Sequence, residues 1–482
     1  MAFNNNNKIH QHLKVVPPSS SSSSQTTITI PLTSYDLLFL RSRPVERIFF
    51  YTLINSQSHP SFFFQNIVPT LNSSLSLTLQ HFLPIAGKIV WPSDSSKPFI
   101  RFNPNDNDTG VSLLIAESNA DFDHVISNSP HEASLSRSFI PDLESSDSFA
   151  SIISLQITFF PNSGFGIGIT SHHAVFDGKS SSMFMKAWAY ICNKIIQSET
   201  PTLLPELEPS FNREIIDDKN GDDSIERINK LFQTETVNQR SLKIFPFETK
   251  LVDSVRATFK LTREDLDIIK QNVLSKWEIS DTNESKPHTL SSFVLTCAHS
   301  VVSIAKAMHG VEKEREKFSF AFAVDCRARL EPQVPNNYFG NCVRGAFMDT
   351  KPFDFKEEDS VFVVAKRMHE KIKMIKEKGL EGNILDVYDK YNSLNNEGCE
   401  TIGIAGSNRF GVYETDFGFG RPKKVEIVSI DGGLAIGLSE SKDGNGGVEV
   451  GLVRNRHVMD LFSILFHGFQ HCNKPASLLA TC

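Results

Sequence analysis

Two adjacent histidines and an aspartate stand within one short segment, TSHHAVFDGKSSSMF, which covers residues 170–184. Asp177 follows His173 by four residues. Imidazole exchanges protons near neutral pH, so His173 is a candidate general base, and Asp177 could fix the loop around it. The alternative is a buried histidine beside a turn-forming aspartate. The pattern of residues alone leaves both interpretations open.

Two other kinds of chemistry fit this segment less well. A catalytic zinc ion needs three protein ligands, but adjacent histidines at the end of a strand point to opposite faces. The chain also contains no HExxH motif. A nucleophilic serine needs a histidine aimed at it, and no GxSxG motif precedes a helix here. We therefore expect neither a metal site nor a nucleophilic serine.

The segment falls between a predicted β-hairpin and a predicted helix. Alternating apolar residues predict strands at 151–160 and 164–170, joined by a turn. Apolar residues with helical spacing predict a helix over 183–196, and the serines at 180–182 are candidate N-cap residues. The histidines and Asp177 thus lie at a strand–loop–helix junction, a common place for functional side chains.

The rest of the chain mixes helices and strands, which predicts an α/β or α+β class in two similar halves. Helical patterns cover 261–275, 290–308 and the C-terminal region, whereas strand patterns occur at 318–330 and 424–453. We predict four parts: a disordered Asn- and Ser-rich tail (1–26), an N-terminal domain (27–200), a linker rich in Pro and acidic residues (201–245) and a C-terminal domain (246–482).

Composition narrows the class of protein. The chain has 482 residues, a net charge of −7 and 40% hydrophobic residues. This charge does not favour nucleic acid, and no apolar run has the length of a transmembrane helix. The N-terminus is too polar for a signal peptide, and seven cysteines without a CxxC pair fit a reducing compartment. We expect a cytoplasmic monomer without a membrane or nucleic-acid partner.

Three motifs carry a resemblance to a known family. HHAVFDG (172–178) resembles the HHxxxDG signature of CoA-dependent acyltransferases and of peptide-synthetase condensation domains. DFGFG (416–420) looks like the DFGWG motif of the plant BAHD acyltransferases, with Phe419 in place of the usual Trp. YFGNC (338–342) is similar to an element of that family's anthocyanin and phenolic-glucoside branch. No carrier or adenylation segment supports the peptide-synthetase alternative.

The resemblance implies a fold and a mechanism. It implies two domains like chloramphenicol acetyltransferase, each a mixed sheet flanked by helices, with a channel between them and His173 at its centre as general base. Asp177 is then expected to turn away from the substrates and pair with an arginine of DCRAR, either Arg327 or Arg329, of which we favour Arg327. The other residues implied to support the site are Gly178, Asp416, Gly418 and Gly420.

The resemblance also implies the substrates. The continuation DGKS is similar to that of the phenolic-glucoside malonyltransferases, which implies transfer of malonyl from malonyl-CoA to a phenolic or flavonoid glucoside without a separate cofactor. A hydroxycinnamoyl donor and a non-catalytic binding protein are the alternatives. Lys179 could bind the malonyl carboxylate, whereas Ser181 stands where some malonyltransferases have Arg. Tentative CoA-binding residues are Lys270, Ser291 and Ser292.

Overall fold

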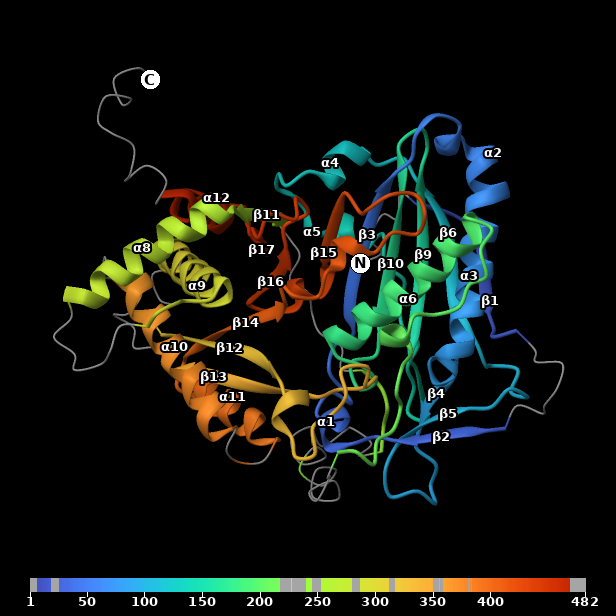
Figure 1. Cartoon of the computed structure of the whole chain (residues 1–482), viewed down its shortest axis with the longest axis horizontal. Helices are drawn as coiled ribbons and strands as arrows, with labels where there is room; N and C mark the ends of the chain where they lie inside the picture. The colour runs from blue at the N-terminus through green and yellow to red at the C-terminus, as the bar shows by residue number, and fades with distance from the viewer. Residues whose placement is uncertain are drawn as a thin grey trace.

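The computed structural model of the chain contains three β-sheets with helices packed on their faces (Figure 1). It describes residues 7–18, 26–216, 227, 240–244, 253–279, 287–311, 317–349, 355, 359–379, 382 and 384–468. The two larger sheets each combine parallel and antiparallel neighbours, so the predicted fold of two mixed sheets with flanking helices is confirmed. No helix in these ranges is long and apolar enough to cross a membrane.

The first sheet has six strands in the order β1–β6–β9–β10–β3–β15. Their bounds are β1 Asn7–Val15, β3 Val45–Thr52, β6 Val111–Ser118, β9 Ile153–Phe160, β10 Gly164–Ser171 and β15 Lys424–Ile427. The hairpin predicted from the apolar alternation is formed by β9 and β10. Helices α3 (Val68–His81) and α6 (Gly178–Ile196) cover one face, and the short helices α4 (Phe122–Ile126) and α5 (Ala133–Arg137) lie at the other.

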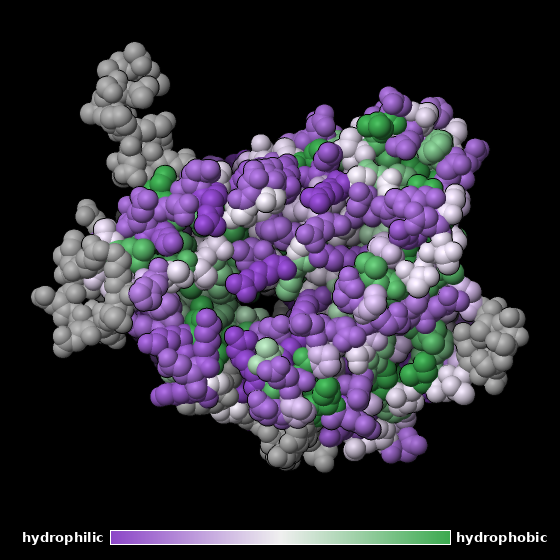
Figure 2. All heavy atoms as spheres, viewed as in Figure 1, coloured by the Kyte–Doolittle hydropathy of each residue, from purple (hydrophilic) through white to green (hydrophobic). Residues whose placement is uncertain are grey.

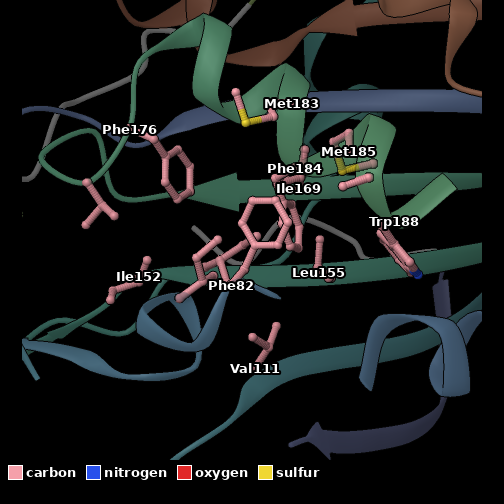
Figure 3. Close-up of a cluster of buried hydrophobic side chains, with 14 of the residues drawn as sticks. Phe82, Val111, Ile152, Leu155, Ile169, Phe176, Met183, Phe184, Met185 and Trp188 are labelled. Carbon is pink, nitrogen blue, oxygen red and sulfur yellow. The ribbon is translucent and has the colours of Figure 1, made fainter. Parts of the chain in front are cut away.

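The core between α6 and the first sheet fixes the helix that follows the histidines. Figure 3 shows Phe184 of α6 beside Ile169 of β10, with Leu155 of β9 and Trp188 of α6 in the same cluster. Phe184 meets Phe82 edge to face, with ring centroids 5.4 Å apart. These side chains are fully buried, and each contributes about 1.5–3 kcal/mol of burial free energy. The α6 N-terminus therefore has a defined position relative to β10.

The second sheet has seven strands in the order β13–β12–β14–β16–β17–β11–β7. Its strands are β7 His131–Glu132, β11 Ser254–Leu261, β12 Phe318–Asp325, β13 Val343–Asp349, β14 Glu400–Gly406, β16 Ala435–Glu440 and β17 Val448–Asn455. A separate hydrophobic core joins this sheet to α8 (Arg263–Ile279), α9 (Ser292–Val311), α10 (Ser360–Lys378) and α12 (Arg456–His467). These helices form the outer layer at the left of Figure 1.

Smaller elements complete the part of the chain that contains the site. The third sheet has four strands: β2 Ile28–Pro31, β4 Lys88–Val90, β5 Phe99–Phe102 and β8 Phe149–Ser151. Helix α1 (Ser34–Leu37) follows β2 directly, and helix α11 (Asp386–Asn396) packs against β13 and β14. The third sheet and α1 belong to the same hydrophobic core as α6.

The two halves of the chain exchange a strand in each direction. β15 comes from the C-terminal half but pairs with β3 of the first sheet, where Ile427 lies opposite Arg47. β7 comes from the N-terminal half but pairs with β11 of the second sheet, where His131 lies opposite Arg256. Two strands therefore cross the predicted division into residues 27–200 and 246–482. Their backbone hydrogen bonds join the two sheets.

The N-terminal region differs from the prediction. Residues 7–15 form β1, which pairs with β6 from Asn7–Ser118 to Val15–Val111, so the predicted disordered tail over 1–26 is wrong for this stretch. Most side chains of β1 are exposed, which explains its polar composition. An edge strand is held mainly by its backbone hydrogen bonds and needs few apolar residues. Residues 1–6 and 19–25 lie outside the described residues.

Part of the predicted linker packs against the YFGNC segment. Ser210 forms a bridge with Tyr338, and Arg213 Nη1 donates to the Phe339 carbonyl at 2.6 Å. The linker predicted over 201–245 therefore includes a well-ordered support for this segment. Its residues 217–226, 228–239 and 245 lie outside the described part of the chain.

Candidate active site

The histidines occupy the junction between β10 and α6. β10 ends at Ser171, and α6 begins at Gly178 with Asp177 as its N-cap. The Asp177 carboxylate accepts the Ser180 backbone N–H at 2.9 Å, so the N-cap is Asp177 and not one of the serines at 180–182. An aspartate is among the best N-cap residues because its oxygen satisfies an otherwise unpaired N–H. Gly178 lies so near Phe410 that a Cβ would come within 2.8 Å of the ring.

His173 is held on two sides by side chains that are distant in the sequence. Its ring stacks on Phe39 with centroids 3.8 Å apart and an angle of 2° between the planes. Its carbonyl accepts the Asn341 side-chain amide at 2.8 Å. The residue is half-buried, but Nδ1 is fully buried, which leaves Nε2 as the ring nitrogen available to a substrate.

The protonation of His173 suits a general base. Burial lowers its pKa from the usual 6.5, because the charged imidazolium is poorly solvated there. Its own backbone, the Asp177 charge and the Asn341 side chain oppose this shift. His173 is therefore neutral at neutral pH and able to accept a proton.

Asn341 is itself fixed by a buried carboxylate on α1. Asp36 is fully buried, and its Oδ1 accepts the backbone N–H of Asn341 at 3.1 Å and its side-chain amide at 3.0 Å. Arg213 lies 3.2 Å from the other oxygen of Asp36. Asn341 thus connects α1 to the backbone of His173 through hydrogen bonds, so the position of α1 helps to fix that backbone.

Asp177 forms an ion pair with Arg327 between the two halves of the chain. Arg327 Nη1 lies 2.9 Å from Asp177 Oδ2, and Nη2 lies 3.2 Å from Oδ1, so the pair is bidentate. Cys342 adds a backbone N–H at 3.2 Å. Both side chains of the pair are 2% exposed. Arg329, the other arginine of DCRAR, is exposed and donates to the Asp325 carbonyl.

Arg327 also anchors the YFGNC segment. Its Nη2 donates to the carbonyls of Tyr338 and Gly340 at 3.3 and 3.2 Å. The pair therefore joins the start of α6 to the segment that carries Asn341. Because both carboxylate oxygens of Asp177 make these contacts, Asp177 influences the pKa of the His173 ring through its charge.

His172 has a different environment from its neighbour. It is fully buried, and its Nδ1 accepts the Ala174 N–H at 3.2 Å. Burial, with a smaller contribution from His173, lowers the pKa of His172 to about 3, so it stays neutral. The adjacent histidines thus divide into a buried structural residue and a half-buried candidate base.

The tentative CoA-binding residues lie on three different helices or at their starts. Lys179 lies away from the buried pair, where its ammonium hydrogen-bonds the Asn336 side chain at 2.8 Å and lies 3.7 Å from Asp325. Ser291 and Ser292 are at the start of α9; Ser291 Oγ accepts the Val294 N–H, and Ser292 accepts the Asn408 amide at 3.0 Å. Lys270 is half-buried on α8. None of the described contacts joins these four residues to His173.

The DFGFG segment forms a turn against the core of the first sheet. Asp416 Oδ1 accepts the backbone N–H groups of Gly418 and Gly420 at 2.7 and 3.0 Å. Gly418 has a φ of 93°, which disfavours any other residue. Phe417 is fully buried against Trp188, and Phe419 meets Phe165 edge to face at 5.7 Å. Phe419 thus keeps the aromatic packing at this position, although it lacks the indole N–H of the usual Trp.

We expect Asp416→Ala to lower stability without changing the chemistry. The substitution leaves two backbone N–H groups without their charged acceptor, which costs about 1.5–3 kcal/mol. The free energy of unfolding in urea should fall by this amount, while the KM for each substrate stays within twofold. Asp416→Asn, which keeps an acceptor oxygen, should recover part of the loss; a variant with normal stability and lost activity would contradict this assignment.

Three features of the site were not predicted from the sequence. Asp36 stands in a capping box with Thr33, a local pattern that is visible in the sequence but says nothing of Asn341. Asn341 lies inside the YFGNC motif, yet its contacts with His173 and Asp36 span 168 and 305 residues. Phe39 has no sequence signal that relates it to the base.

Comparisons with known proteins show the family and the fold to which the chain belongs. The model of the Transferase family matches residues 9–466. The chain is 37% identical to the malonyl-CoA:anthocyanidin 5-O-glucoside-6''-O-malonyltransferase of Arabidopsis thaliana, over 96% of this chain and 98% of that protein. It is 38% identical to phenolic glucoside malonyltransferase 1 of the same organism, over 92% and 93%. The crystal structure of vinorine synthase has the same fold, with a TM-score of 0.67, 19% identity and coverage of 96% and 98%.

The fold and the HHAVFDG junction define a transferase with the BAHD architecture. The chain belongs to the Transferase family, and the resemblance inferred from its three motifs is confirmed. It is an acyltransferase.

Proposed function

We propose that the protein transfers malonyl from malonyl-CoA to the glucose 6-hydroxyl of a phenolic or flavonoid glucoside. The observation that carries the chemistry is the neutral, half-buried His173, fixed by Phe39 and Asn341 at the junction of the two halves. The substrate class is supported by two relatives that are 37% and 38% identical and are named as glucoside malonyltransferases.

The chemistry of the acceptor determines the order of proton transfer. A sugar hydroxyl is far less acidic than imidazolium, so His173 cannot ionise it in advance. Instead, Nε2 accepts the proton while the hydroxyl oxygen attacks the thioester carbonyl carbon. The tetrahedral intermediate then collapses, the carbon–sulfur bond breaks, and protonated His173 returns the proton to the CoA sulfur. The products are the malonyl ester and CoA, and no acyl-enzyme is formed.

Asp177 and Arg327 are positioning residues in this mechanism. They hold the α6 N-terminus and the YFGNC segment together, so His173 and its anchor Asn341 keep a fixed relation. Placing acceptor and thioester in contact contributes more to the rate than proton transfer alone. The reaction needs no cofactor apart from the acyl-CoA co-substrate. We further propose a cytoplasmic monomer that binds these two small molecules.

A donor competition tests the proposed function. The purified protein is offered equal concentrations of malonyl-CoA and p-coumaroyl-CoA, with a flavonol glucoside and a naphthol glucoside as acceptors, and product masses are measured. We expect a malonyl mass increment that is strongly reduced in His173→Ala. A coumaroyl increment would retain the mechanism and replace the donor; release of no CoA with either donor would favour a binding protein.

A further inference from the structure

A polar pocket lies between the two large sheets. It is lined by β3 and β15 of the first sheet, by β11, β16 and β17 of the second, and by Val412 and Ile430 from adjoining turns. Figure 2 shows a hollow near the centre of one face of the molecule, between the region where β14 and β16 lie in Figure 1 and the lower end of α6. The pocket thus lies where β15, one of the two exchanged strands, meets the second sheet.

Three of the four charged side chains that line this pocket have partners. Arg256 donates to the carbonyls of Ile427 and Val428 at 2.7 and 2.8 Å. Glu426 accepts the Ser136 hydroxyl at 2.8 Å. Glu449 accepts the Tyr413 hydroxyl at 2.6 Å. These groups are part of the structural contact between the sheets.

Arg47 of β3 differs from Arg256, which lies 3.8 Å from Glu426 and 3.9 Å from Asp431, in having no ion pair among the described residues. Its side chain is 4% exposed, and its Nη1 donates to the Ser182 hydroxyl at 3.1 Å. Its Nε is buried without a hydrogen-bond acceptor, and no carboxylate among the described residues lies within 4.0 Å of its guanidinium. Burial lowers the pKa of Arg47 to about 10, opposed by the more distant Glu440, so the group remains charged at neutral pH. A buried guanidinium normally has an anionic partner.

Arg47 lies beside the segment that carries the base. In the antiparallel pair of β3 and β10, Arg47 is directly opposite Ile169, four residues before His173. Directly opposite residues project to the same face of a sheet, and here that face is covered by α6. Its hydrogen bond to Ser182 reaches α6 five residues after its N-cap, Asp177. Arg47 therefore connects β3, opposite Ile169 of β10, to Ser182 of α6, on either side of the junction that carries the histidines.

We propose that Arg47 binds the free carboxylate of the acyl donor and makes the enzyme selective for malonyl over uncharged acyl groups. This inference rests on the proposed function and adds the residue that recognises the donor. A guanidinium offers two parallel N–H groups that match a carboxylate, whereas an acetyl group offers no charge. Ser181 on α6 stands where some malonyltransferases have Arg and carries no charge. Arg47 on β3 then provides the positive charge that binds the carboxylate.

The experiment compares kcat/KM for malonyl-CoA and acetyl-CoA with one phenolic glucoside. We expect Arg47→Gln to reduce the malonyl-to-acetyl ratio by about 10- to 100-fold, because a hydrogen bond between charged groups is lost. Arg47→Lys keeps the buried charge and should retain part of the preference, since an ammonium lacks the fork geometry. It also provides a second variant if Arg47→Gln fails to fold.

Two further variants make the result specific. Arg41→Gln removes another buried arginine, whose Nε donates to the Ser241 carbonyl, and should leave the donor ratio unchanged. Lys179→Ala tests the residue suggested by the sequence. The proposal is overturned if Arg47→Gln and Arg47→Lys lose both donors equally, or if the selective loss appears in Lys179→Ala instead. Failure of the wild-type protein to use malonyl-CoA would refute the proposed function itself.

Discussion

Replacement of His173 by alanine is expected to lower kcat/KM by about 10² to 10⁴-fold, the usual contribution of a general base. The loss should fall on kcat, because the substrates are bound mainly by other groups and the base acts as the new bond forms. The ring is half-buried and its anchors, Phe39 and Asn341, remain in the variant, so the fold should be retained. Steady-state kinetics with malonyl-CoA and a phenolic glucoside measure the effect.

The pH dependence identifies the base independently of the size of the loss. His173 acts in its neutral form, and burial lowers its pKa below 6.5. The wild-type kcat/KM should therefore rise with pH along an acidic limb whose midpoint lies below pH 6.5, and then become constant at higher pH. The residual activity of His173→Ala should lack this acidic limb. His172→Asn, which alters the adjacent buried histidine, is the matched control and should retain it; persistence of the limb in His173→Ala would point to another base.

The elements around the base could be predicted because their signals are local. The alternation of apolar residues in 151–170 and the helical spacing in 183–196 correspond to β9, β10 and most of α6. The start of α6 was predicted too late, because serine and aspartate are both good caps and only the geometry distinguishes them. In the structure, Asp177 caps the helix and pairs with Arg327 through the same carboxylate.

The anchors of the base could not be predicted because they depend on contacts across the whole chain. Phe39 and Asn341 approach His173 from either end of the sequence, and neither belongs to a periodic pattern that would indicate this contact. Strand β1 escaped prediction for a related reason: its exposed side chains resemble those of a disordered segment, and only its pairing with β6 distinguishes it. The exchange of β7 and β15 likewise has no sequence signal.

Arg47 illustrates a signal that was present but ambiguous. In VERIFFYT both faces of the strand carry apolar residues and are buried, and the arginine shares its face with Phe49 and Tyr51. A charge at such a position indicates either an ion pair or a functional group. The contacts of its neighbours in the pocket, rather than its own sequence context, favour the functional interpretation.

Replacement of Arg327 by glutamine is expected to have the largest effect on stability. It leaves Asp177 buried without its counter-charge, which costs about 3–5 kcal/mol in the free energy of unfolding. It also removes the donor to the Tyr338 and Gly340 carbonyls, so the segment that carries Asn341 loses its fixed position. A small displacement of the catalytic group can reduce kcat by up to about 10²-fold. Urea unfolding and steady-state kinetics measure the two effects.

Control variants distinguish the effect of the ion pair from the other effects of Asp177 and Arg327 on stability and activity. Arg329→Gln changes the exposed arginine two residues away and should alter stability by no more than about 0.5 kcal/mol. Asp177→Asn keeps an N-cap side chain but removes the charge, so Asp177→Asn combined with Arg327→Gln should be less destabilised than the sum of the single variants. The acidic limb of the pH profile should persist in Asp177→Asn, because His173 is still present. Additive losses of stability in the double variant would show that Asp177 and Arg327 act separately. A coupling free energy between the two substitutions would instead show that their ion pair holds the two halves together around His173.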